Sequence, residues 1–150
     1  MRDNFRAFLV KLANVNEQDL GNNLLIFLLC GHGVLRSLDW ITMSTTSLEK
    51  VSPIYNKLSH ILDIHALGWL FLLFSATLLL SMFFKGQPSY IFLMLGALGS
   101  SVCHLIFGVI ATEGAALFVT YYFMLLIGII QIILCVLGGA QLWKIKHLKK

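Results

Sequence analysis

Three long apolar runs constrain this chain more than any other feature of its sequence. Residues 66–84 and 115–143 contain no charged side chain, and residues 90–111 contain only the ionisable His104. A helix needs roughly 20 apolar residues to cross a bilayer core about 30 Å thick, and each run has about that length. Of all residues, 58% are apolar and only 12% are charged. These figures exclude a disordered chain and disfavour a soluble globular domain.

A fourth run, residues 24–43, begins with the segment LLIFLLC and then carries His32, Arg36 and Asp39. Its length and the position of Trp40 near its end favour another span, with the charges close to one interface. We therefore predict an all-α polytopic integral membrane protein. It would form one domain, a four-transmembrane-helix bundle with spans at about 24–43, 62–84, 90–111 and 115–143.

The lysines and arginines are distributed unevenly around these spans. Eight of the eleven lie before the first span, between the second and third, or after the fourth. We therefore expect the protein to lie in the plasma or inner membrane of the cell. By the positive-inside rule, both of its termini should face the cytoplasm. The segments 44–60 and 112–114 would then face outward.

The segments beside the spans show two helical patterns. Residues 1–20 place apolar side chains at helical spacing, with most basic residues off that stripe. This predicts a short basic amphipathic helix, either in the cytoplasmic leaflet or packed against the bundle. In the outer loop, Ser52 and Pro53 favour a helix start, and the apolar residues that follow predict an amphipathic helix leading into the second span. Residues 44–47 are typical of a turn.

The last segment, residues 144–150, is a basic tail. An interfacial tryptophan followed by lysines is typical of a helix end held at anionic lipid headgroups. We therefore expect Trp143, Lys144 and Lys146 to anchor the fourth span. Membrane anchoring accounts for this charge, and no nucleic-acid partner is predicted.

Ionisable groups inside spans are costly and are candidates for a functional site. In the predicted topology they gather in one layer near the outer interface. Arg36 and Asp39 lie one helical turn apart and can pair with each other or with another helix. This predicted polar cluster consists of His32, Arg36, Asp39, Asp63, His65, His104 and Glu113.

Three roles are open for this cluster: a structural polar network, the handling of protons or small solutes, and a metal or haem site. No cofactor is predicted in the first two cases. In the third, His32, His65 and His104 would be the ligands, since imidazole is a common ligand of transition metals. The cysteines Cys30, Cys103 and Cys135 are interpreted as small packing residues, not as a disulfide framework.

Small residues form a second pattern, in the third and fourth spans. Gly96, Ser100 and Gly108 recur at multiples of four with His104, and Gly128, Gln131 and Gly139 lie along one side of the last span. Small residues allow helices to approach closely in lipid. Gln131 needs a hydrogen-bond partner, for which His104 and Ser100 are candidates. These residues would either hold the bundle together or join two copies.

The sequence carries no Walker loop, no dinucleotide-binding glycine fingerprint and no hydrolase or zinc-protease motif. The leading hypothesis is therefore a non-enzymatic membrane protein. Its partners would be the lipid bilayer and either other membrane subunits or further copies of itself.

Two resemblances suggest alternatives. Through the segment GHGVLR at 31–36 and through His104, the layout resembles small four-span families, among them the DoxX-like membrane proteins. That resemblance implies a redox-active or quinone-linked protein that uses the outer histidines. The small size, basic termini and glycine-rich spans are similar to those of some phage holins, which implies a former of membrane lesions.

Overall fold

The computed structural model describes residues 17–112 and 118–148, and all regular secondary structure in these ranges is helical. Three long helices are α2 (Glu17–Thr42), α6 (Gln87–Thr112) and α7 (Phe118–Leu148). The helix α5 (Ile64–Leu80) is shorter, and α3 (Thr45–Val51) and α4 (Pro53–Ile61) are short. The predicted all-α fold class is therefore correct.

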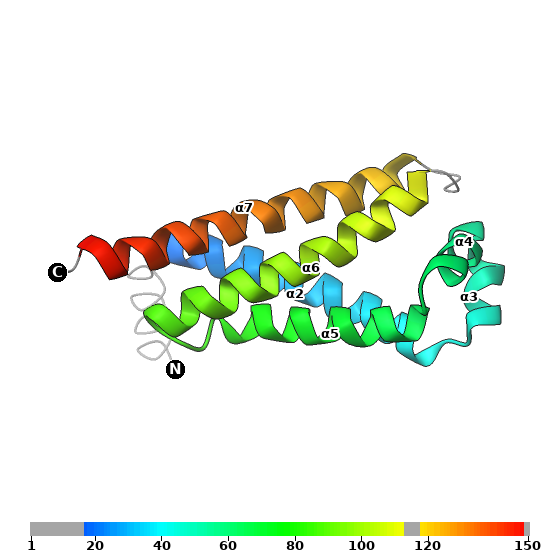
Figure 1. The fold of residues 1–150 in the computed structure, drawn as a ribbon, viewed down its shortest axis with the longest axis horizontal. Helices are drawn as coiled ribbons and strands as arrows, with labels where there is room; N and C mark the ends of the chain where they lie inside the picture. Colours follow the sequence, from blue (N-terminus) through cyan, green and yellow to red (C-terminus); the bar gives the residue numbers. More distant parts are fainter. Residues whose placement is uncertain (1–16, 113–117, 149–150) are drawn as a thin grey trace, which may run out of the picture.

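The long helices and α5 lie side by side along one axis, as Figure 1 shows. α5 packs against α2 and α6, and α7 packs mainly against α6. The short helices α3 and α4 lie together at one end, which we call the α3–α4 end. The turn between α5 and α6, residues 81–86, lies at the opposite end, where α7 also finishes. We call this the turn end.

Three helices are long and apolar enough to cross a membrane: α2 over Leu20–Thr42, α6, and α7 over Tyr121–His147. α4 and α5 meet at an angle of 90° across a short break, and this bent pair is a fourth candidate if it counts as one span. Much of the described surface is apolar; Phe27, for example, is 61% exposed and Val136 is 65% exposed. Such a surface suits lipid, where apolar side chains need no burial against protein.

Several element boundaries differ from those predicted. α2 begins at Glu17, so residues 17–20 belong to it and not to a separate amphipathic helix; residues 1–16 lie outside the described part. α5 spans only Ile64–Leu80 of the predicted 62–84, and residues 44–47 are not a turn alone, because α3 begins there. α7 continues to Leu148, so most of the predicted basic tail is helical.

Side-chain caps explain how the chain changes direction at the α3–α4 end. The Ser44 hydroxyl accepts from the backbone N–H of Ser47 at the start of α3, and the Ser52 hydroxyl accepts from Ile54 N–H at the start of α4. Asp63 Oδ1 then accepts from the first N–H groups of α5. Such caps satisfy donors that the first helical turn leaves without a partner. Three caps in succession therefore allow two sharp bends.

An aromatic core joins this end to the long helices. The indole of Trp40 on α2 lies 5.7 Å from the ring of Phe71 on α5 and 5.4 Å from the ring of Phe107 on α6, between centroids. Tyr55 on α4 reaches the same Phe107 ring at 6.0 Å. All four side chains are at most 5% exposed. The core therefore packs α4 together with α2, α5 and α6.

Candidate functional site

Two histidines from different helices form the centre of the candidate site. His32 on α2 and His104 on α6 stack with ring centroids 5.3 Å apart, and His32 Nδ1 lies 3.2 Å from His104 Nε2. On its other side, His104 Nδ1 lies 2.9 Å from Gln131 Oε1 on α7 and 2.9 Å from the carbonyl oxygen of Ser100. His104 and Gln131 are each 1% exposed. One buried imidazole thus connects three helices.

The partners of His104 determine the direction of these hydrogen bonds. The carbonyl of Ser100 can only accept, so His104 Nδ1 must carry the hydrogen. In the neutral imidazole, Nε2 then accepts, and His32 Nδ1 must donate to it. The hydrogen bonds therefore run from α2 through His104 to α6 and α7. His32 Nε2 keeps its lone pair.

Aromatic rings enclose the histidine pair. Phe71 on α5 meets the His104 ring edge-on, with centroids 4.7 Å apart, and Phe123 on α7 meets the His32 ring in the same manner at 5.7 Å. His104 is buried beneath these rings, whereas His32 is half-buried. In apolar surroundings, losing a hydrogen bond costs more free energy, because the unpaired polar group cannot bond to water instead.

Arg36 lies one turn beyond His32 on α2, and its environment is unusual for a cation. Its guanidinium lies over the ring of Phe107, with Cζ 4.6 Å from the centroid, and within 6.0 Å of the Trp40 and Tyr55 centroids. Within residues 17–112 and 118–148, no carboxylate forms an ion pair with it. Cation–π contacts compensate part of the desolvation of Arg36 but do not satisfy its N–H donors.

Among residues 17–112 and 118–148, three buried polar atoms in this region have no hydrogen-bond partner: Arg36 Nε, Trp40 Nε1 and Ser100 Oγ. The first two are donors on successive turns of α2, and Trp40 is only 1% exposed. Buried donors are nearly always paired, so each exception requires an explanation such as a bound molecule. Two N–H donors of the site, one of them cationic, therefore have no acceptor among the residues that the structure describes.

The other members of the predicted polar cluster lie apart from this centre. Asp39 is exposed and makes no ion pair with Arg36, although the two share a helix. Asp63 caps α5, and His65 contributes its backbone N–H to that cap. Glu113 lies outside the described residues. The structure thus brings together His32, Arg36 and His104 but not Asp39, Asp63 and His65.

The donor arrangement does not suit a metal at His104. Its Nδ1 donates a hydrogen and its Nε2 accepts one, so neither nitrogen has a lone pair available. In the described ranges, no three residues of the His, Cys, Asp and Glu types lie close enough to hold a metal ion together. Cys30 and Cys103 are buried free thiols.

The small residues of α6 and α7 lie at contacts within the chain. A side chain at Gly96 would strike the backbone of Leu78 on α5. A Cβ at Gly108 would lie 2.9 Å from Leu125, and one at Gly128 would lie 2.8 Å from Leu105, across the α6–α7 contact. Gly139 faces Met94 more loosely. In the described chain, these positions therefore lie at or near helix contacts inside the bundle.

The predicted anchoring residues occupy the end of α7. Trp143, 59% exposed, stacks near His147 with ring centroids 5.2 Å apart, and Lys144 and Lys146 are exposed. They belong to the last turns of α7, which finishes at the turn end (Figure 1).

Sequence reasoning missed the aromatic residues of the site, which are Trp40, Tyr55, Phe71, Phe107 and Phe123. The chain has many aromatic residues, so residue type alone does not distinguish those of the site from the others. For Trp40 and Phe107 there was one weak signal, since each lies a few residues from an ionisable group. Tyr55 comes from α4, and its approach to Arg36 depends on the bend between α4 and α5.

No protein-family model matches this sequence, and searches among curated proteins and solved structures gave no match.

Proposed function

We propose that this chain is a non-enzymatic, multi-pass membrane protein that binds an amphiphile. The head of that amphiphile would carry hydrogen-bond-accepting oxygens, as a carboxylate or a quinone carbonyl does. The two buried donors without a partner, Arg36 Nε and Trp40 Nε1, are the observation that carries this proposal. A ligand oxygen that reached either nitrogen would accept its hydrogen bond.

The charge of Arg36 supports an oxygen-bearing head. An arginine in a membrane helix is stable only with a counter-charge, polar atoms or water near it. The described chain gives this one three aromatic faces and no carboxylate. A guanidinium matches a carboxylate with two parallel hydrogen bonds and a carbonyl with one. Because carboxylate and quinone heads share this acceptor chemistry, the experiment must separate them.

The surroundings support an amphiphilic ligand. Arg36 is half-buried and so reaches the surface, while Trp40 and Phe107 beneath it are buried. Beside it on α2, the apolar side chains Leu35 and Leu38 are 68% and 43% exposed. A ligand could therefore hold its head against the donors and leave an apolar tail along α2 in the lipid.

A four-span topology is part of this proposal. If α4 and α5 form one bent span, α2, α5, α6 and α7 cross the membrane, and the positive-inside rule places both termini in the cytoplasm of the cell membrane. The α3–α4 end then faces outward, with Arg36 in the outer half. Association with other membrane subunits remains a prediction from the sequence.

Arg36→Gln should weaken binding of the ligand by about 10- to 100-fold, because a hydrogen bond to a charged group contributes about 1.5–3 kcal/mol. The measurement is isothermal titration calorimetry of the detergent-solubilised protein. One titration uses oleate and the other uses decyl-ubiquinone. The compound that binds with the higher affinity identifies the class of head group. Lys50→Gln is the control, since it removes an exposed cation at the same end.

Saturable binding in one arm that Arg36→Gln weakens and Lys50→Gln does not would support the proposal. Two results would contradict it. If neither compound binds, the two donors are satisfied by water. If both variants bind as well as the original chain, the binding takes place elsewhere.

A further inference from the structure

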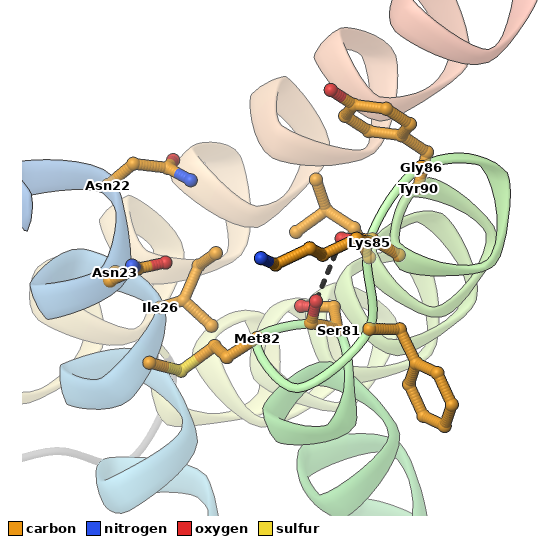
Figure 2. Close-up of a pocket in the computed structure, with 11 residues that line it drawn as sticks. Asn22, Asn23, Ile26, Ser81, Met82, Lys85, Gly86 and Tyr90 are labelled. Carbon is orange, nitrogen blue, oxygen red and sulfur yellow. Dashed lines mark hydrogen bonds between the residues drawn. The ribbon is translucent and has the colours of Figure 1, made fainter. Parts of the chain in front are cut away.

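A polar cavity lies at the turn end of the bundle. It has a volume of about 340 Å³ and lies between the start of α2, the α5–α6 turn and the start of α6. Figure 2 shows Lys85 reaching across it, with its amino group directed toward Asn22, Asn23 and Ile26 of α2. Gly86, with a φ of 73°, follows Lys85 and turns the chain into α6.

The polar groups of this cavity are mostly donors without partners. Within the described residues, the Lys85 ammonium and the Asn22 and Asn23 carboxamides make no hydrogen bond or ion pair. Tyr90 adds a hydroxyl from α6. By contrast, the Ser89 hydroxyl already donates to the Ser81 carbonyl at 2.8 Å. No described residue that lines the cavity carries a carboxylate. The cavity therefore presents a net positive, donor-rich lining.

An adjoining hollow of about 300 Å³ extends this cavity along α7. The two share Asn22, Tyr90 and Leu93, so they form one continuous groove. The wall of the extension is mainly apolar, formed by Leu93, Leu134, Leu137 and Gly138, with Gln141 at its end. α2 and α7 do not pack closely together along their length, which leaves this groove open between them.

We propose that this groove binds an anionic phospholipid. Its phosphate would lie between Lys85 and the two asparagines, and one acyl chain would follow the apolar wall of α7. Basic pockets between transmembrane helices are known to recognise anionic headgroups. A free phosphate would use only the polar half of the groove, whereas a phospholipid uses both halves. This site shares no residue with the site at Arg36.

The experiment is native mass spectrometry of the detergent-solubilised full chain, titrated with dioleoylphosphatidylglycerol and, in parallel, with dioleoylphosphatidylcholine. The two lipids have the same acyl chains, so a difference reports on the headgroup. We expect one tightly held phosphatidylglycerol per chain. Lys85→Gln should weaken it about five- to tenfold, as expected for one lysine near a lipid phosphate. Lys50→Gln, which removes an exposed charge from the α3–α4 end, should have little effect.

A second pair of variants tests the apolar half of the groove. Leu137→Trp should obstruct the acyl chain and lower phosphatidylglycerol binding, while Val136→Trp, one residue away and outside the groove lining, should not. Equal binding of the two lipids, or equal effects of Lys85→Gln and Lys50→Gln, would overturn the proposal. Displacement of the lipid by glycerol 3-phosphate would also overturn it, because the site would then hold a free phosphate.

Discussion

Gly96→Ala should destabilise the bundle by about 1–3 kcal/mol, the usual range for overpacking a well-packed core. A Cβ at this position would overlap the backbone N and Cα of Leu78, which cannot move aside as the end of a flexible side chain can. α5 and α6 would have to separate at their crossing. The measurement is the midpoint of thermal unfolding in detergent. Gly96→Leu should lower it further.

Gly31→Ala is the matched control for this prediction. Gly31 also lies inside a membrane-length helix, but a Cβ there would have no neighbouring atom within 4 Å. Since alanine favours a helix over glycine, this change should be neutral or stabilising by up to about 1 kcal/mol. If both variants lower the midpoint equally, Gly96 does not lie against the backbone of Leu78 where α5 and α6 cross.

His104→Leu should destabilise the bundle by about 1–2 kcal/mol, as expected for interhelical hydrogen bonds in a membrane. The change leaves Gln131 Oε1 without its donor and His32 Nδ1 without its acceptor. Both partners would then lie in apolar surroundings unpaired. His60→Leu, an exposed histidine on α4, should change stability by no more than about 0.5 kcal/mol.

A double-mutant cycle separates the hydrogen bond from general packing. Gln131→Leu alone should cost about as much as His104→Leu, but the two together should cost clearly less than their sum. Once both polar partners are replaced, neither is left unsatisfied. Additive costs would mean that His104 and Gln131 do not interact.

The sequence was most informative about the long helices, because continuous apolar length is a property of the chain alone. It was less informative about helix ends. α3 consists largely of Thr, Ser and Val, which favour a helix weakly, and it forms because Ser44 caps it and Leu48 is buried beneath it. α5 begins at Ile64 because Asp63 caps it.

In the candidate site, too, the sequence predicted some features and not others. Helical spacing on α6 and α7 indicated that Gln131 needed a partner such as His104, and the two do share a hydrogen bond. Spacing on α2 also allowed Arg36 to pair with Asp39, yet the guanidinium lies over Phe107 and beside Tyr55 instead. Those two rings belong to other helices. Their approach depends on the tertiary fold, so no periodicity within α2 could reveal it.

The most direct test of ligand binding at Arg36 and Trp40 is the NMR signal of the Trp40 indole N–H in protein labelled with ¹⁵N-tryptophan. The chain has three tryptophans, and Trp40→Phe identifies the signal. When the ligand found by titration is added, the Trp40 indole proton should shift downfield as its nitrogen gains an acceptor. The signals of Trp69 and Trp143, both exposed, should stay in place. An unchanged Trp40 signal, or equal shifts of all three, would contradict the proposed site.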